Sequence, residues 1–77
     1  MPHIVVKMYP GRTDADKARL AEALSKAMID TLGTSEKAIS VGIEDVTPEN
    51  WGAQVYRPEI AGKLDTIFKA PGYEPPT

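Results

Sequence analysis

The chain has 77 residues, a formal net charge of −2 and no cysteine. The acidic balance argues against binding to nucleic acids or anionic membranes, and the lack of cysteine excludes disulfide bonds and cysteine-based metal sites. A core of this size contributes only about 3–5 kcal/mol, so association with further copies is the stabiliser we expect, and the chain is predicted to be a homo-oligomer.

Residues 1–77 are predicted to form one domain. His3 is the only histidine, so no metal site is predicted, and no cofactor motif such as a P-loop or GxGxxG is present. No apolar run approaches the ~18 residues of a membrane span. The N-terminal sequence lacks the basic region and small-residue cleavage site of a signal peptide, so we expect a cytoplasmic protein.

The first predicted element is a strand over residues 3–9, which ends at a Pro-Gly pair. Alternation places Ile4, Val6 and Met8 on one face. The opposite face also carries apolar side chains. We therefore expect cover on both faces, from the chain's own helix and from a second subunit.

The second predicted element is a long helix ending at Leu32. Thr13 is a good N-cap, and Asp16, three residues on, completes a weak variant of the capping box. Apolar residues then recur at steps of three and four as far as Leu32. Gly33 suits the position that follows a helix end.

A second strand is predicted over residues 38–46. Ile39, Val41 and Ile43 share one face, and a smaller, more polar face carries Ser40, Gly42 and Glu44. Two strands joined by a long helix form a right-handed βαβ unit, so the strands should be parallel.

The C-terminal part is predicted to be helical. Thr47 and Pro48 suit the cap and first position of a short helix, and Pro58 is predicted to open a second stretch. That stretch has an apolar stripe of Ile60, Leu64, Ile67 and Phe68. Residues 74–77 are predicted to be a loose tail.

The predicted fold class is therefore α/β, with a single βαβ unit plus a short C-terminal helix. Its two-stranded sheet has open edges, which a second subunit would complete.

Few residues are candidates for catalysis. The remaining possibility is acid–base catalysis by carboxylates, by His3 or by the N-terminal amine. A Met before a residue as small as Pro favours removal of the initiator Met. Pro2 would then carry a secondary amine, which can take a proton, in place of an inert amide. Many chains begin Met-Pro for no catalytic reason, so this pair alone does not decide the function.

Pro2 at the start of a strand, followed by Pro10-Gly11-Arg12-Thr13-Asp14 entering a long helix, resembles the 4-oxalocrotonate tautomerase family. In that family a processed N-terminal Pro starts the first strand, and a Gly-Arg-Ser/Thr-Asp turn joins it to the helix. The match continues through the second strand to Trp51. The remaining tail is similar to the longer branch of the family, that of the bacterial dimeric phenylpyruvate tautomerase, which favours a dimer over a hexamer.

The resemblance implies a cofactor-independent enol–keto tautomerisation of a small 2-oxo acid, with Pro2 as general base. Such a base works best with a pKa near 7. A free α-amine has a pKa of about 7.7–8.0, and a secondary amine is more basic. The pKa of Pro2 would therefore need to be lowered by desolvation and by a nearby cation such as Arg12.

Two further residues are candidates for substrate binding. Arg12 would bind the substrate carboxylate through its planar fork and stabilise charge on the carbonyl oxygen. The alternative is a solvated Arg, although a helix start is unfavourable for a cation. Trp51 would form an apolar pocket wall, and a place in the core or at a subunit interface is about equally expected. His3 should point away from Pro2 and serve a structural role.

Ser40 departs from the family pattern. Short, hexameric members carry there an Arg that binds the far end of a dicarboxylate, and Ser40 is short and uncharged. A monocarboxylate with an apolar or aromatic tail, such as phenylpyruvate, is therefore the expected substrate.

Two alternatives stay open. One is a hydratase, dehalogenase or decarboxylase of the same superfamily that uses Pro2; it would need further acidic or Arg partners, for which Glu44 and Glu49 are candidates. The other is a non-enzymatic small dimer that binds a ligand or a partner. Retention of Met1 would favour the second, because it would remove the base.

Overall fold

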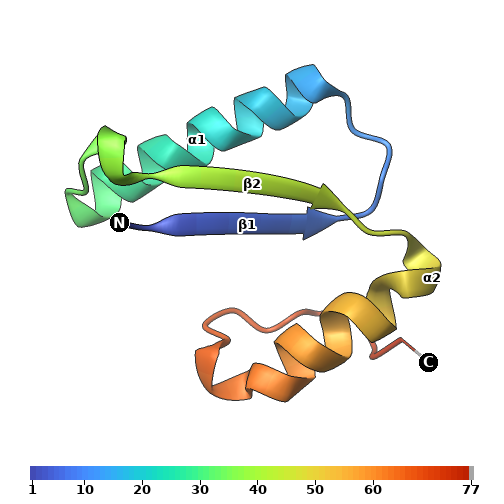
Figure 1. The fold of residues 1–77 in the computed structure, drawn as a ribbon. Helices are drawn as coiled ribbons and strands as arrows, with labels where there is room; N and C mark the ends of the chain where they lie inside the picture. The colour runs from blue at the N-terminus through green and yellow to red at the C-terminus, as the bar shows by residue number, and fades with distance from the viewer. Residues whose placement is uncertain (77) are drawn as a thin grey trace. The chain divides into compact units, whose positions relative to one another are not determined.

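The computed structural model describes residues 1–76, which fall into two compact units divided between Asp45 and Val46 (Figure 1). The first unit holds β1 (His3–Met8), α1 (Asp14–Leu32), the short 3₁₀ turn η1 (Glu36–Ala38) and β2 (Ser40–Asp45). The second holds α2 (Pro48–Trp51), η2 (Gly52–Ile60) and η3 (Ala61–Thr66). That the two units make one domain stays a prediction.

The parallel βαβ unit predicted from the sequence is confirmed. β1 and β2 pair in parallel, with His3 opposite Ser40 and Met8 opposite Asp45. Both strands are shorter than predicted, and η1 occupies residues that include the predicted start of the second strand. A parallel pair needs a long crossover connection, and α1 provides it.

The ends of α1 form as the sequence predicts. The Asp16 N–H donates to Thr13 Oγ1 at 3.0 Å, and the Thr13 N–H donates to Asp16 Oδ2 at 3.5 Å. At the other end Gly33 has a φ of 69°, and its N–H donates to the Ile29 carbonyl at 2.9 Å. This left-handed backbone favours glycine, which has no Cβ to clash.

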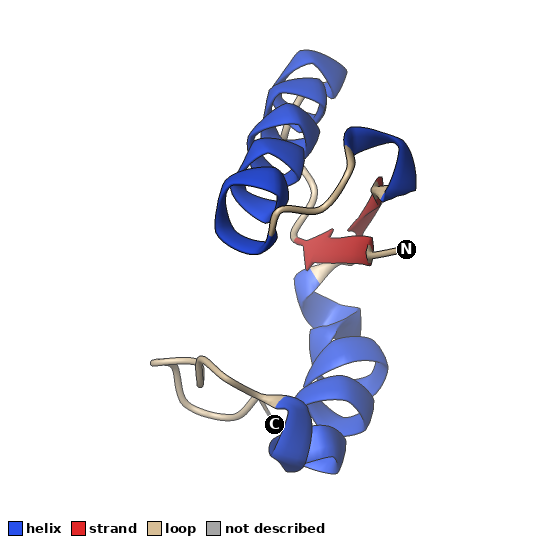
Figure 2. Ribbon diagram, turned by 90° about the vertical axis from the view of Figure 1, so that its left-hand side faces the viewer, coloured by secondary structure: helices blue, strands red, loops and turns tan. Residues whose placement is uncertain are grey.

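Only one face of the sheet meets a helix of the same unit. The register places Ile4 beside Val41 on one face, and Leu24 and Met28 of α1 surround the same hollow as Ile4. Figure 2 shows α1 lying to one side of the strands. On the other face, Val5 is 44% exposed.

The chain on its own has little core. No residue of 1–45 is buried, and Val46 and Val55 are the only buried hydrophobic residues among those described. Small domains depend on hydrophobic burial or on association for their stability. This distribution supports the predicted homo-oligomer, which itself stays a prediction.

The predicted short helix with Thr47 as its cap and Pro48 at its first position is confirmed, but the predicted start of a second helical stretch at Pro58 is wrong. The helix begins at Pro48, directly after Thr47, and Pro58 lies inside η2, which has the wide hydrogen-bonding pattern of a π-helix. Proline cannot donate the bond that an α-helix needs in its interior. The helix therefore continues through Pro58 with π-type hydrogen bonding. At its end the Ala61 N–H donates to both the Tyr56 and Arg57 carbonyls.

The predicted apolar stripe does not form a packed face in this part of the chain. Phe68 is 97% exposed, so its predicted packing is wrong for residues 1–76. The reason is a kink at Lys63, where φ is −139° and ψ is 44°, followed by extended backbone at Ile67. Helical spacing cannot align side chains across such a break.

Gly62 and the tail complete the second unit. A Cβ at Gly62 would lie 2.8 Å from the Arg57 carbonyl oxygen, so this close approach requires glycine. Residues 74–76 have no regular structure, and the last residue of the predicted tail lies outside the described part. None of the helices in residues 1–76 has the length and apolar character needed to cross a bilayer, and the cellular location stays a prediction.

Candidate active site

Pro2 lies at the N-terminal end of β1 and is half-buried. Its carbonyl accepts a hydrogen bond of 3.2 Å from the Ser40 N–H, which extends the parallel ladder by one step. Its nitrogen is joined to the fully exposed Met1 and is an amide in this covalent form. Removing Met1 would expose the nitrogen as an amine and leave the ladder bond intact, because that bond uses the carbonyl.

Ser40 also bonds to a side chain beside Pro2. His3 Nδ1 lies 2.6 Å from Ser40 Oγ, and both residues are exposed. The sequence analysis missed this contact, because it depends on the register that sets His3 opposite Ser40. Ser40, the uncharged residue that departs from the family pattern, is thus hydrogen-bonded to His3.

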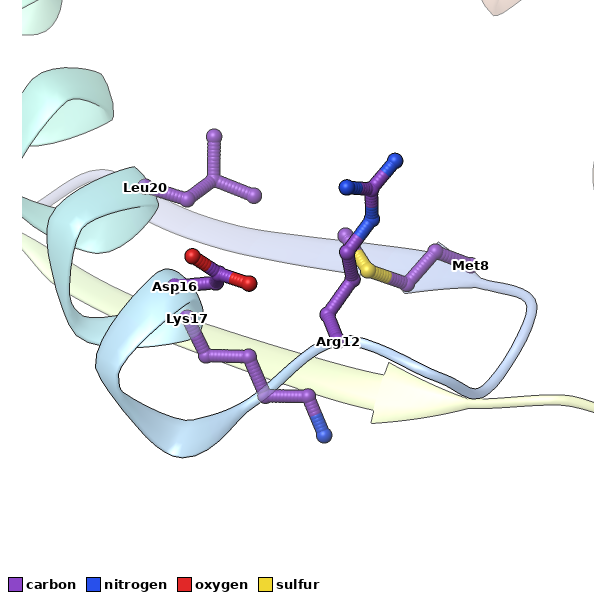
Figure 3. A pocket seen from close by; sticks show the side chains of 5 residues that line it. All are labelled: Met8, Arg12, Asp16, Lys17 and Leu20. Atoms are coloured by element: carbon purple, nitrogen blue, oxygen red, sulfur yellow. The ribbon is translucent and has the colours of Figure 1, made fainter.

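Arg12 lies in the loop between β1 and α1, beyond the other end of the strand. It lines a pocket of about 310 Å³, together with Met8, Asp16, Lys17 and Leu20 (Figure 3). The Arg12 guanidinium has several hydrogen-bond donors and shares the pocket with the apolar side chains of Met8 and Leu20, which suits the binding of a small carboxylate.

Pro2 and Arg12 are not brought together within one copy of the chain. β1 has six residues and separates them. At about 3.3 Å per residue, the strand spans roughly 20 Å. A single small substrate cannot touch both residues of the same copy.

The other charged residues of the Arg12 pocket are held by partners. Lys17 Nζ lies 3.0 Å from Asp45 Oδ1 and 3.1 Å from Asp45 Oδ2, which ties the start of α1 to the end of β2. Asp16 is bound by Arg19 as well as by the Thr13 N–H. Within residues 1–76, Arg12 makes no ion pair.

Trp51 belongs to the second unit, at the end of α2. Its Nε1–H donates to Tyr73 Oη at 3.1 Å, and the ring of Tyr73 lies 6.1 Å from that of Tyr56, tilted by 56°. Trp51, Tyr56 and Tyr73 thus form an aromatic cluster within the second unit. The role of Trp51 as a wall of the substrate pocket stays a prediction.

The two acidic candidates, Glu44 and Glu49, belong to different units. Glu44 stands opposite Lys7, near the far end of the strand pair, and Glu49 is an exposed residue of the other unit. Among the described residues, no group of three or more His, Asp or Glu side chains could hold a metal ion.

The chain matches known proteins over most of its length. A family model described as "Tautomerase enzyme" covers residues 2–60. A probable tautomerase of Xylella fastidiosa is 44% identical over 73 residues, which is 95% of this chain and 89% of that protein. Tautomerase PptA of Cronobacter sakazakii is 41% identical over 75 residues, or 96% of this chain and 99% of that one.

Solved structures agree with the sequence matches. TomN, a 4-oxalocrotonate tautomerase homologue of tomaymycin biosynthesis, is 42% identical with a TM-score of 0.62, over 65% of this chain and 77% of that one. YwhB, another homologue of 4-oxalocrotonate tautomerase, is 43% identical with a TM-score of 0.58, over 60% and 75%. The chain is therefore an enzyme of the 4-oxalocrotonate tautomerase family, a keto–enol isomerase.

Proposed function

We propose that the protein interconverts the enol and keto forms of a 2-oxo monocarboxylic acid with an apolar or aromatic tail, for which phenylpyruvate is the model substrate. The Pro2 amine is the general base after removal of Met1. The observation that carries the proposal is the position of Pro2: its carbonyl is fixed by the Ser40 N–H at the end of the ladder, so its nitrogen is free of the sheet's hydrogen bonding.

The proton moves in two steps. The neutral Pro2 amine takes the proton of the enol hydroxyl as the carbonyl forms, and the resulting ammonium gives a proton to the neighbouring carbon. Such a positioned acid–base group contributes about 10²–10⁴-fold to a rate. Desolvation and a nearby guanidinium would lower the pKa of the amine towards neutrality.

The guanidinium comes from a second copy. Because Pro2 and Arg12 lie at opposite ends of β1, two copies related by a twofold axis across the outer edges of their β1 strands would run antiparallel. Arg12 of one copy would then approach Pro2 of the other and bind the substrate carboxylate. We propose a homodimer of this kind, with Trp51 as an apolar wall of the site.

The preference for a monocarboxylate follows from the Pro2 end of the sheet. Ser40 carries no charge, and its hydroxyl is engaged by His3. A second carboxylate held near this end would lose its hydration without gaining a cation, which is costly. An apolar tail has no such cost.

The hydratase, dehalogenase or decarboxylase reading has less support. It requires an acidic or Arg partner, in addition to Arg12, that activates water beside Pro2, and the relatives that match most of the chain are named tautomerases. The non-enzymatic reading has less support still, because the chain belongs to a family of enzymes.

The proposal is tested by following ketonisation of phenylpyruvate enol for the wild type, Pro2→Ala and Arg12→Ala. Pro2→Ala leaves a weaker primary amine, and we expect kcat to fall about tenfold or more. Arg12→Ala removes a charged hydrogen-bond partner, and we expect kcat/KM to fall about 10–100-fold. Wild-type rates in both variants would rule out the proposed site.

A further inference from the structure

The Arg12 pocket contains an anion as well as a cation. Asp16 lines the pocket together with Arg12, at the first turn of α1. A carboxylate so close in sequence is a built-in competitor for the guanidinium, because it has the same chemistry as a substrate carboxylate.

Each oxygen of this carboxylate accepts a hydrogen bond from a group other than Arg12. Asp16 Oδ1 accepts a hydrogen bond from Arg19 Nη2, and Asp16 Oδ2 accepts from the Thr13 N–H at 3.5 Å. Figure 3 shows the Arg12 guanidinium extending away from the ribbon, beyond Met8. Within the described part of the chain Arg12 makes no ion pair, although it shares a pocket with the Asp16 carboxylate.

The pocket's second cation is not available to a ligand. Lys17 is half-buried and contacts both carboxylate oxygens of Asp45, and in Figure 3 its amine points to the side opposite the Arg12 guanidinium. Among residues 1–76 that line this pocket, Arg12 is therefore the cation left for a substrate carboxylate.

We propose that Arg19 is a positioning residue: it binds the Asp16 carboxylate and so keeps Arg12 available to the substrate. The inference rests on the proposed function in that Arg12 is the group that binds the carboxylate. The Arg19 side chain is 74% exposed and that of Asp16 is 36% exposed, so the effect is modest. If Asp16 captures Arg12 with the strength of an exposed ion pair, the available fraction of Arg12 falls and the apparent KM rises about two- to sixfold.

The test is a double-mutant cycle with phenylpyruvate. Arg19→Ala should raise KM about two- to sixfold and leave kcat unchanged, because the reacting atoms are untouched. Adding Asp16→Asn to Arg19→Ala should return KM to the wild-type value, since the amide cannot capture Arg12 but can still accept the Thr13 N–H.

Two controls separate this mechanism from a general effect of charge. Lys26→Ala breaks the Lys26–Asp30 pair of 2.6 Å on the same helix and should leave KM unchanged. The double variant Arg19→Ala with Asp30→Asn restores the net charge away from the pocket, and its KM should stay raised. An unchanged KM in Arg19→Ala, or recovery with Asp30→Asn as complete as with Asp16→Asn, would overturn the inference.

Measuring the affinity for a non-reacting ligand tests the role of Arg19 independently of the role of Pro2 as the base. Phenylacetate carries the carboxylate and ring but no 2-oxo group, and its binding can be followed at the Arg12 Nε–H resonance. We expect the variants with a raised KM to bind phenylacetate more weakly than the wild type, and the variants with an unchanged KM to bind it equally well. Failure of Pro2 as the base would appear in kcat and leave these differences in affinity intact, whereas equal affinities would overturn the role of Arg19 alone.

Discussion

At the first step of the ladder, Ser40 holds two neighbouring residues in different ways. Its N–H binds the Pro2 carbonyl, and its hydroxyl binds the His3 ring. Residue 40 is therefore the ladder neighbour of the proposed base, and its side chain lies on the same face of the sheet as that of His3. A change in its length and charge should alter which substrates the site accepts.

We predict that Ser40→Arg shifts the preference from phenylpyruvate towards a 2-oxo dicarboxylate such as oxaloacetate. A new charged hydrogen bond should raise the ratio of the two kcat/KM values about tenfold or more. The measurement is enol–keto interconversion of both substrates. Ser40→Ala, which also loses the His3 contact but adds no charge, is the control, and an equal shift in both variants would refute this account of the position.

At the scale of elements, the N-terminal cap of α1 and the Arg12 pocket share one residue, Asp16. The hydroxyl of Thr13 accepts from the Asp16 N–H at 3.0 Å, whereas Thr47, the corresponding residue of α2, makes no side-chain cap bond. Comparing alanine substitutions of the two threonines therefore measures how much the side-chain cap bond contributes to stability.

Thr13→Ala should lower the free energy of unfolding by about 1 kcal/mol, within a range of 0.5–2 kcal/mol, because a helix-end N–H loses its acceptor. Thr47→Ala should change it by less than about 0.5 kcal/mol. Chemical denaturation of both variants measures the difference. Equal effects would mean that the Thr13 bond contributes nothing specific to stability.

The elements that could be predicted from the sequence are those set by local chemistry. The period of α1, its Thr13 cap and its Gly33 end are encoded within a few residues, and all formed as predicted. The helix through Pro58 could not be predicted, because proline normally ends such a segment and only the wide π-type bonding accommodates it here.

The candidate site was only partly predictable for a different reason. Pro2 and Arg12 carry recognisable chemistry in the sequence, but the length of β1 sets them apart within one copy. The contact of His3 with Ser40 depends on the register of two strands far apart in sequence. The pairing of Arg19 with Asp16 is local, but its relevance appears only once Asp16 is found in the Arg12 pocket.

At the scale of the whole molecule, the small core and the separation of Pro2 from Arg12 both support the proposed homodimer. The first unit has no buried residue, and Val5 is exposed on the sheet face opposite α1. If stability depends on association, it must depend on protein concentration.

We predict that a tenfold dilution lowers the stabilisation of the homodimer by about 1.4 kcal/mol and its melting temperature by several degrees. Sedimentation should give twice the mass of the 8.4 kDa chain. A monomeric mass with a melting temperature independent of concentration would contradict a site built from two copies.

The central claim is that the Pro2 nitrogen is the base, and the most direct measurement compares the same chain with and without Met1. Both forms can be made by chemical synthesis and assayed for ketonisation of phenylpyruvate enol after mass spectrometry confirms each. The ladder bond to the Pro2 carbonyl exists in either form, so the sheet should not change. We predict activity in the chain that begins at Pro2 and a loss of about 10²-fold or more when Met1 is present; equal activity in both forms would contradict the account.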